Sequence, residues 1–187
     1  MRIISGYLKG KKIHLPRDDF TRPLKDMVKE SIFNIIEHSN DIKCQLEGAL
    51  ILDLFSGSGS FGLECLSRGA EKVISNENYN IALEILEKNI KNLNCENKCQ
   101  ILKSSCFDLH KKINEKFDII FVDPPFKEKK IIELINLIFE AKILKNECLI
   151  ILHRKKSSED VLSEKLKIID TRYYGVSKII FYKPLFA

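Results

Sequence analysis

The regular alternation of short apolar segments with amphipathic segments, which begins at residue 49, most constrains how this chain can fold. Residues 49–54 form an apolar run, as expected of a strand buried on both faces, and a helical pattern follows it. The predicted strands lie at 49–54, 72–75, 100–103, 117–122 and 148–152, and the predicted helices lie at 60–67, 79–92, 108–113 and 129–141. This order predicts an α/β fold with a doubly wound, mostly parallel sheet that carries helices on both faces.

The two ends of the chain depart from this alternation. Residues 168–174 and 177–182 are joined at Gly175 with no room for a helix, so they predict an antiparallel C-terminal hairpin. Near the start, residues 2–7 and 11–15 predict a short hairpin, and a helix is predicted at 24–38. The expected organisation is a basic extension, residues 1–23, followed by a single domain, residues 24–187.

Composition places the chain among ordinary globular proteins, and we expect it in the cytoplasm. It is 44% hydrophobic and 30% charged, and none of its apolar runs approaches the ~20 residues that span a bilayer. The N-terminal residues lack the long apolar core of a secretory signal. The six cysteines, at positions 44, 65, 95, 99, 106 and 148, include no CxxC pair, so we expect reduced thiols and no metal site.

Positive charge is concentrated in the N-terminal segment. The net charge is +5, and residues 1–17 carry five basic side chains and no acid. Such a patch is typical of a protein that binds a nucleic-acid backbone, although a solvated, lysine-rich surface gives the same pattern. The residues that we expect to contact phosphates are Arg2, Lys9, Lys11, Lys12 and Arg22.

A glycine-rich turn follows the first strand of the alternation. Ligands of open α/β sheets bind beyond the carboxyl ends of the strands, and Gly57 and Gly59 allow a sharp turn and a close approach there. The helix that starts near Ser60 adds free N–H groups. Gly57, Gly59 and Gly62 also match G-x-G-x-x-G, so a dinucleotide-binding enzyme is an alternative.

Two acids, Asp53 and Glu77, bear on which cofactor the site could bind, and only Asp53 favours one kind of cofactor over the other. Asp53 ends the first strand, where a carboxylate suits an ammonium group, as in methionine, and is unfavourable beside a pyrophosphate. Glu77 follows the second strand and can accept both ribose hydroxyls of either kind of cofactor. Ser105 and Cys106, after the third strand, are placed to hold an adenine. The predicted cofactor-binding residues are Asp53, Phe55, Gly57, Ser58, Gly59, Glu77, Asn78, Ser105 and Cys106.

The tetrapeptide Asp123-Pro124-Pro125-Phe126 follows the fourth strand, on the same rim as the glycine turn. The two prolines lack N–H donors, so they present carbonyl oxygens without competing donors. Asp123 and the Pro124 carbonyl can accept both N–H groups of an exocyclic amine, which aims the nitrogen lone pair at a methyl donor. Phe126 offers a flat face on which a base can stack. These four residues are the predicted catalytic site, although the tripeptide alone could be only a rigid turn.

These motifs together resemble those of a known family. Residues 1–6, 21–23, 30–34, 53–59, 62–70 and 123–126 resemble, in the same order, the motifs of the bacterial 16S ribosomal RNA (guanine-N2) methyltransferases of the RsmD type. The resemblance runs over nearly the whole chain. It implies a seven-stranded, Rossmann-like class I methyltransferase fold, S-adenosylmethionine as the cofactor, and methylation of the 2-amino group of one guanine in 16S ribosomal RNA.

The resemblance also implies roles for particular positions. Asp53 and the glycine turn would surround the methionine part of the cofactor, Glu77 would hold the ribose, and residues 123–126 would hold the target amine. Residues 21–23 would border the cofactor pocket and the path of the RNA. Leu24 stands where the family usually has threonine, and Ser105 stands where most members have an acid or amide.

Several alternatives stay open at this point. A DNA amino-methyltransferase performs the same nitrogen chemistry, although the chain leaves no region for a separate DNA-recognition domain. A non-catalytic RNA-binding or ribosome-assembly factor could keep the fold. A nicotinamide-dependent reductase would need a hydride-handling residue near the glycine turn, which we do not find. We expect 16S ribosomal RNA or a small-subunit assembly intermediate as partner, no membrane association, a monomer, and no role for His153.

Overall fold

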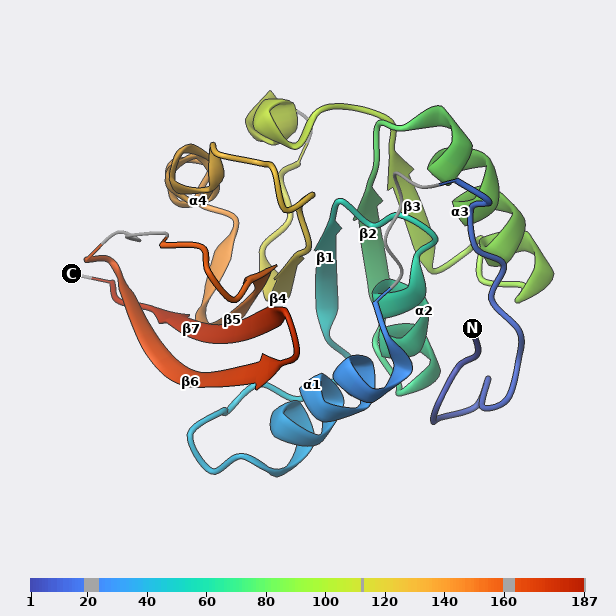
Figure 1. The fold of residues 1–187 in the computed structure, drawn as a ribbon, viewed down its shortest axis with the longest axis horizontal. Helices are drawn as coiled ribbons and strands as arrows, with labels where there is room; N and C mark the ends of the chain where they lie inside the picture. Colours follow the sequence, from blue (N-terminus) through green and yellow to red (C-terminus); the bar gives the residue numbers. More distant parts are fainter. Residues whose placement is uncertain (19–23, 112, 160–163, 187) are drawn as a thin grey trace.

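A computed structural model of the chain describes residues 1–18, 24–111, 113–159 and 164–186. A seven-stranded sheet with the order β3-β2-β1-β4-β5-β7-β6 forms the centre of the molecule (Figure 1). The strands are β1 (Leu50–Leu54), β2 (Lys72–Asn76), β3 (Cys99–Leu102), β4 (Phe117–Val122), β5 (Leu144–Lys155), β6 (Leu166–Tyr174) and β7 (Ser177–Pro184). The strands β1 to β5 are parallel, and β7 is antiparallel to both β5 and β6. The predicted α/β fold with an antiparallel C-terminal hairpin is therefore confirmed.

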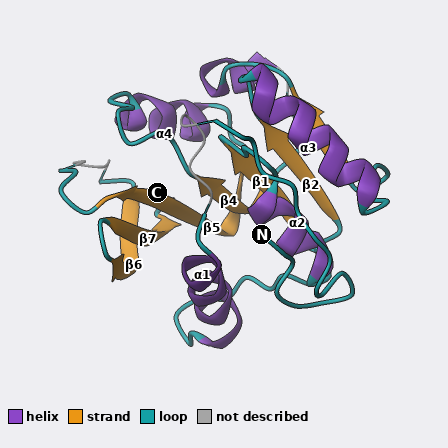
Figure 2. Ribbon diagram, turned by 45° about the vertical axis from the view of Figure 1, so that its right-hand side comes forward, coloured by secondary structure: helices purple, strands orange, loops and turns teal. Residues whose placement is uncertain are grey.

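Helices cover both faces of this sheet (Figure 2). They are α1 (Asp26–His38), α2 (Ser60–Ser67), α3 (Asn80–Asn92), the 3-10 helix η1 (Cys106–Lys111) and α4 (Ile131–Glu140). One apolar cluster joins α1, α2 and α3 to the sheet, and a second cluster joins η1 and α4 to the opposite face. Alternate residues of a strand belong to different clusters, as Ile51 and Leu52 of β1 do. Both faces of β1 are thus buried, which explains its apolar sequence.

The order of the strands reverses between β1 and β4. From β1 the chain builds β2 and β3 outward on one side, and it then returns to place β4 on the other side of β1. Crossovers on the two sides of such a switch point diverge, which leaves space beyond the carboxyl ends of the two central strands. The fold therefore places the turn after β1 and the turn after β4 at one edge.

The N-terminal segment pairs with itself less extensively than predicted. Arg2 and Lys12 form an isolated antiparallel bridge, in place of two full strands at 2–7 and 11–15. The pairing ends because the N–H groups of Ile4 and Ser5 donate instead to the Glu64 carboxylate of α2, at 2.8 and 2.9 Å. A contact between residues sixty positions apart thus replaces the local ladder.

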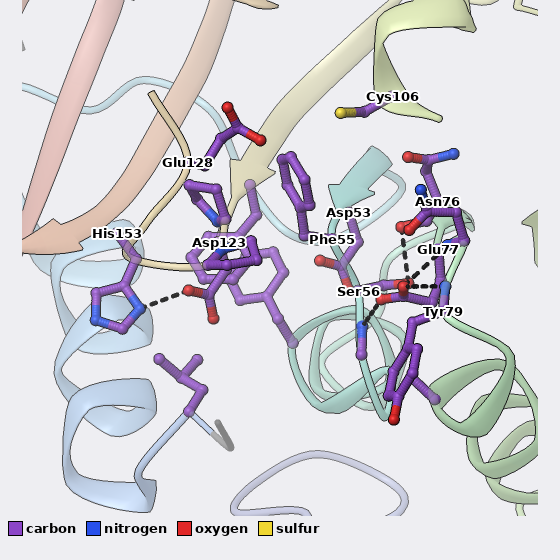
Figure 3. Close-up of a pocket in the computed structure, with 18 of the residues that line it drawn as sticks. Asp53, Phe55, Ser56, Asn76, Glu77, Tyr79, Cys106, Asp123, Glu128 and His153 are labelled. Carbon is purple, nitrogen blue, oxygen red and sulfur yellow. Dashed lines mark hydrogen bonds and ion pairs between the residues drawn. The ribbon is translucent and has the colours of Figure 1, made fainter. Parts of the chain in front are cut away.

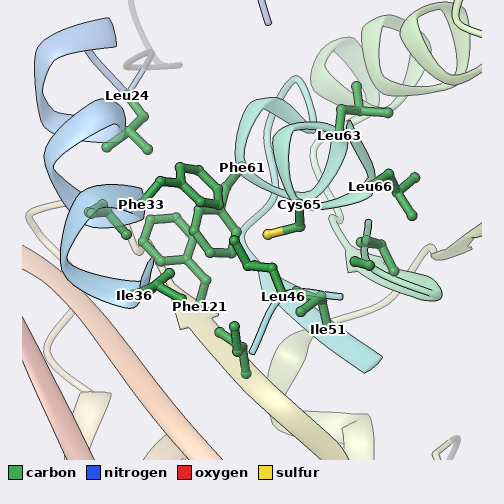
Figure 4. Close-up of a cluster of buried hydrophobic side chains, with 14 of the residues drawn as sticks. Leu24, Phe33, Ile36, Leu46, Ile51, Phe61, Leu63, Cys65, Leu66 and Phe121 are labelled. Carbon is green, nitrogen blue, oxygen red and sulfur yellow. The ribbon is translucent and has the colours of Figure 1, made fainter. Parts of the chain in front are cut away.

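The same segment is also part of the main hydrophobic core. Ile3, Leu8 and Ile13 are buried in the apolar cluster that contains α1 and α2. Beside them, the aromatic rings of Phe61 and Phe121 stack at a centroid distance of 4.0 Å (Figure 4). The basic extension and the α/β domain therefore share one core.

A fully buried ion pair fixes the N-terminal segment to both helices beneath it. Lys29 Nζ of α1 lies 3.3 Å from Glu64 Oε2 of α2, and neither side chain is exposed. Lys29 also donates to the carbonyl oxygen of Arg2 at 3.0 Å, and Arg68 donates to Glu64 Oε1 at 3.0 Å. Burial lowers the pKa of Lys29, while the charge of Glu64 opposes this shift. Removing one partner would leave an uncompensated buried charge, which typically costs about 3–5 kcal/mol.

Most elements begin and end within two residues of their predicted bounds, and β5 and the short helix after β3 illustrate the differences. β5 begins at Leu144 rather than 148, because Leu144 pairs with Phe117 and three exposed polar residues continue the strand before its apolar part. The short helix predicted at 108–113 is the 3-10 helix at Cys106–Lys111. The chain break predicted at 21–23 lies outside the described residues.

All six cysteines are free, and each is buried or half-buried. Burial raises the pKa of every one of these thiols, to about 12 for Cys44, Cys99 and Cys106. No group of three His, Cys, Asp or Glu side chains that could hold a metal ion occurs within the described residues. In this part of the chain, no helix is both long enough and apolar enough to cross a membrane.

Candidate active site

A cavity of about 760 Å³ opens at the carboxyl ends of the central strands (Figure 3). Its volume is in the range typical of small-molecule sites, roughly 300–1,000 Å³. The predicted residues that line it are Asp53, Phe55, Gly57, Ser58, Glu77, Asn78, Ser105, Cys106, Asp123, Pro124, Pro125 and Phe126. Gly59 is not among the residues that line the cavity. The two predicted sites, for the cofactor and for the target amine, thus lie in one cavity.

The glycine turn has an unusual backbone. Phe55, Gly57 and Gly59 all have positive φ, at 58°, 54° and 77°. Two backbone hydrogen bonds help to hold the turn, from Ser56 N–H to the Asn76 carbonyl at 3.0 Å and from Gly59 N–H to the Ser56 carbonyl at 2.8 Å. A bulky residue such as Phe55 rarely adopts positive φ, and such strain is concentrated at functional sites. Contact of this turn with a ligand stays a prediction, and the positive φ of Phe55 supports it.

Asp53 lies at the floor of the cavity and is only 1% exposed. Its Oδ2 accepts a hydrogen bond from Gly62 N–H of α2 at 3.1 Å. Burial raises the pKa of Asp53 to about 8, although the Gly62 hydrogen bond opposes the shift and the nearby acids Asp123 and Glu77 add to it. A positively charged ligand group beside Asp53 would relieve this penalty on the carboxylate.

Glu77 is tied to the backbone on both of its oxygens (Figure 3). Oε2 accepts from Gly57 N–H at 2.8 Å, and Oε1 accepts from the N–H groups of Asn78 and Tyr79, each at 2.9 Å. A carboxylate offers about four lone-pair sites, so one site on Oε2 is left for a ligand. The free site on Oε2 is available for a ribose hydroxyl, and acceptance of both ribose hydroxyls by Glu77 stays a prediction. The side chain also links the glycine turn to the start of α3.

The predicted adenine site lies where β3 ends. Ser105 Oγ accepts from Phe107 N–H at 3.3 Å and so caps the start of η1. Burial raises the pKa of the Cys106 thiol to about 12, so this side chain is neutral at physiological pH. Cys106 and Phe107 line the cavity beside Asn78, which gives this end of the cavity a weakly polar wall.

Asp123 and His153 form a close pair at the other end of the cavity (Figure 3). Asp123 Oδ1 lies 2.7 Å from His153 Nδ1. The ring of Phe126 packs edge-on against His153, with a centroid distance of 5.6 Å and an interplanar angle of 79°. The backbone N–H of Asp123 donates to the Leu54 carbonyl at 3.2 Å, which ties this turn to the end of β1.

Sequence reasoning missed several residues of the cavity wall. Asn76 and His153 are buried, and the other lining residues that were not predicted are Leu15, Leu24, Ser56, Ser60, Phe61, Tyr79, Ala82, Phe107, Phe121, Lys127 and Glu128. Asn76 is the last residue of β2 and His153 lies near the carboxyl end of β5, and such positions are a signal that could have identified them. Asn76 Nδ2 donates to the carbonyls of Leu102 and Ser104, at 3.1 and 2.8 Å, and so holds the ends of β2 and β3 together. Leu15 carries no such signal.

The residues predicted to contact RNA are spread over the N-terminal segment. Arg2, Lys9, Lys11 and Lys12 are exposed, and Arg22 lies outside the described residues. The tip of the segment contacts the far end of α2, where Tyr7 N–H donates to the Ser67 carbonyl at 2.9 Å. The other end of α2, at Ser60, lines the cavity. Whether the exposed lysines bind RNA stays a prediction.

Comparison with known proteins agrees with this geometry. Residues 1–183 match the family described as Conserved hypothetical protein 95. The Haemophilus influenzae protein named Ribosomal RNA small subunit methyltransferase D is 31% identical over 94% of this chain and 90% of its own length. A Bacillus subtilis protein named as a candidate rRNA methyltransferase is 35% identical over 98% of both chains.

Solved structures agree in fold over the same length. An Escherichia coli structure described as a candidate methyltransferase has a TM-score of 0.83 and 29% identity, and covers 98% of this chain and 97% of its own. The strand order and the neighbouring structures are those of class I S-adenosylmethionine-dependent methyltransferases. With the family resemblance thus confirmed, the chain belongs to the RsmD-type methyltransferase family that is described as Conserved hypothetical protein 95.

Proposed function

We propose that this protein transfers a methyl group from S-adenosylmethionine to the exocyclic 2-amino group of a guanine in 16S ribosomal RNA. The observation that carries the proposal is that one cavity joins Asp53 and the glycine turn to the Asp123–Phe126 motif. A donor and an acceptor can therefore meet inside it. The names of the relatives, which refer to ribosomal RNA, support the class of substrate.

The residues at one end of the cavity fit the cofactor. Asp53 is buried, and the ammonium group of a methionine moiety beside it would stabilise its charged carboxylate against the burial that raises its pKa. Glu77 Oε2 has a site left for a ribose hydroxyl, and Cys106 and Phe107 form a flat, weakly polar wall for an adenine. When bound, S-adenosylmethionine supplies an electrophilic methyl group.

The residues at the other end prepare the amine. The lone pair of an exocyclic amine is delocalised into its ring, which makes the amine a poor nucleophile. Asp123 and the Pro124 carbonyl accept its two N–H groups and favour a tetrahedral nitrogen whose lone pair points at the methyl group. Transfer would break the sulfur–methyl bond of the cofactor and leave S-adenosylhomocysteine, and the methylated amine nitrogen would carry a positive charge until Asp123 or water takes its surplus proton. Phe126 stacks on the base and holds it in place.

The test is transfer of labelled methyl groups by the purified protein to deproteinised 16S ribosomal RNA and to partly assembled small subunits. We expect N2-methylguanine at one position, identified by nuclease digestion and mass spectrometry. Asp123→Ala should lower the single-turnover rate by at least about 100-fold, the usual contribution of a positioned acid–base group. The affinity for S-adenosylhomocysteine should hardly change, because Asp123 acts on the amine.

Other outcomes would contradict the proposal. Label recovered on adenine or cytosine, or in DNA in preference to RNA, would assign the site to another amino-methyltransferase activity. Absence of transfer together with retained RNA binding would favour the non-catalytic assembly factor. Binding of NADH without binding of S-adenosylmethionine would exclude methyl transfer altogether.

A further inference from the structure

We infer that His153 is a positioning residue of this active site, which holds Oδ1 of Asp123 and leaves Oδ2 for the target amine. The inference rests on the proposed function, and it concerns a residue to which the sequence motifs give no role. Its basis is the 2.7 Å contact between His153 Nδ1 and Asp123 Oδ1. Asp123 lies between His153 and the cofactor-binding acids Asp53 and Glu77 (Figure 3).

The sheet itself places these two side chains together. Val122 of β4 is paired with Leu152 of β5 in the parallel register. Asp123 follows Val122 and His153 follows Leu152, so the register brings these two residues side by side. The imidazole is 7% exposed and the Asp123 side chain is 20% exposed. The contact is therefore made inside the protein, between the residue that follows β4 and a residue of β5, where water competes weakly for it.

Hydrogen bonding determines which nitrogen of His153 carries the proton. An ionised carboxylate can only accept hydrogen bonds, so Nδ1 must be the donor to Asp123. Nε2 is buried and has no hydrogen-bond partner among the described residues. A proton on Nε2 would therefore be a buried, unpaired donor, which is costly. The arrangement therefore favours the tautomer with its hydrogen on Nδ1, which donates it to Oδ1 of Asp123.

The contact with His153 gives the two oxygens of Asp123 different roles. Without a partner, the carboxylate could rotate about its terminal bond and present its oxygens in several directions. With Oδ1 held by His153, Oδ2 has a fixed direction before the base arrives. Phe126 packs edge-on against the same imidazole, so the stacking face and the acceptor share one support. Misplacing a reacting group by about 1 Å can cost about 100-fold in rate.

Three substitutions at this position separate positioning from simple packing. His153→Phe fills the space of the ring and removes the donor. His153→Asn places an amide nitrogen where Nδ1 lies and so can still donate to Asp123. His153→Gln places its amide nitrogen near the position of Nε2, where Asp123 is out of reach. Asparagine and glutamine form the matched pair, because both are neutral, polar amides.

The primary readout is the single-turnover rate at saturating RNA and cofactor. We expect His153→Phe and His153→Gln to lower it by roughly 10- to 100-fold, and His153→Asn to recover most of the loss. S-adenosylhomocysteine affinity should stay within about twofold of the parent in all three, since a defect limited to Asp123 does not reach that end of the cavity. In an Asp123→Ala background, His153→Phe should cause no further loss, because the group it positions is gone.

A second readout does not depend on activity. Nitrogen-15 NMR of the labelled imidazole should report the Nδ1–H form in the parent protein, and a changed tautomer balance in Asp123→Ala. An unchanged rate in His153→Phe, equal rates in the asparagine and glutamine variants, or an Nε2–H form in the parent would each overturn the inference while the proposed function stands. If His153→Phe fails to fold, the asparagine and glutamine pair decides. A parent protein that does not methylate guanine would remove the proposed function itself, whatever the NMR result.

Discussion

Two aspartates at neighbouring strand ends have opposite environments, and this difference suits them to different tasks. Asp53 is 1% exposed, and its pKa is raised to about 8, chiefly by burial. Asp123 is 20% exposed and is hydrogen-bonded to His153. A bound cation relieves the burial penalty on a carboxylate such as Asp53, while a hydrogen-bonded, accessible carboxylate such as Asp123 can accept from an incoming amine.

Asp53 should make the stability of the free protein depend on pH. Folding raises its pKa from the ordinary value of 3.8 to about 8, so between these pH values the folded state binds more protons than the unfolded state. The free energy of unfolding therefore falls as the pH rises through this window, and the contribution of Asp53 is fully present only below it. Asp53→Asn keeps an oxygen for Gly62 N–H and removes the charge. Above pH 8 it should be more stable than the parent by more than about 1.4 kcal/mol, the equivalent of one pKa unit.

The same substitution should weaken cofactor binding by about 1.5–3 kcal/mol, the usual value of a charged hydrogen bond. Urea unfolding at several pH values and calorimetric titration with S-adenosylhomocysteine measure the two effects. Parallel stability–pH curves for the parent and Asp53→Asn would show that this carboxylate does not titrate as the structure implies. The Gln variant of Glu87, an exposed acid on α3, serves as the control for loss of one surface carboxylate.

At the scale of elements, the glycine turn packs closely against α3. A Cβ on Gly59 would lie 2.5 Å from Leu86 Cδ1 of α3, and Gly59 also has a φ of 77°. Gly48 has a similar φ of 71°, but nothing lies within 4 Å of the position of its Cβ. The two positions thus share the backbone cost and differ in steric overlap.

We expect Gly48→Ala to lower the free energy of unfolding by about 1–2 kcal/mol, from backbone strain alone. Gly59→Ala should cost a further ~1–3 kcal/mol, because overpacking is added to the strain. Urea unfolding of the two variants at one pH measures the difference. Equal losses would mean that Leu86 moves aside freely and that α3 is not held against the turn.

Local sequence patterns correctly predicted the elements whose bounds depend on residues within the element itself. They failed where contacts with distant residues determine the structure. The bounds of α2 and β4 agree with the prediction, since each apolar pattern ends where the element does. The prediction of two N-terminal strands was wrong because Glu64, about sixty residues away, accepts hydrogen bonds from the N–H groups of Ile4 and Ser5. His153 was missed for a similar reason: its partner Asp123 is thirty residues away and is reached only through the pairing of β4 with β5.

At the scale of the whole molecule, the N-terminal segment combines a buried side with a charged side. Ile3, Leu8 and Ile13 are in the core, so the segment should unfold together with the domain in one transition. Lys9, Lys11 and Lys12 are exposed. We propose that residues 1–23 are a contact surface for RNA phosphates.

Replacing Lys9, Lys11 and Lys12 by glutamine should weaken RNA binding and leave thermal stability and cofactor affinity unchanged. Each phosphate contact removed should flatten the slope of log affinity against log salt by roughly 0.7–0.9. Filter-binding titrations over a salt series measure this slope. The control replaces Lys43, Lys116 and Lys142, which are exposed in loops that precede β1, β4 and β5. Equal slopes for the two triple variants would show that net charge alone, and not the N-terminal segment, determines the salt dependence.

Because the six thiols are buried or half-buried, they should react slowly with labelling reagents in the folded protein. Alkylating reagents attack the thiolate, and burial keeps each of these groups protonated. A single cysteine introduced on the surface would thus carry a fluorophore or spin label without removal of the native ones. The slow modification of each native thiol would also report how often its own region opens: Cys65 for α2, Cys148 for β5 and Cys106 for the cavity wall.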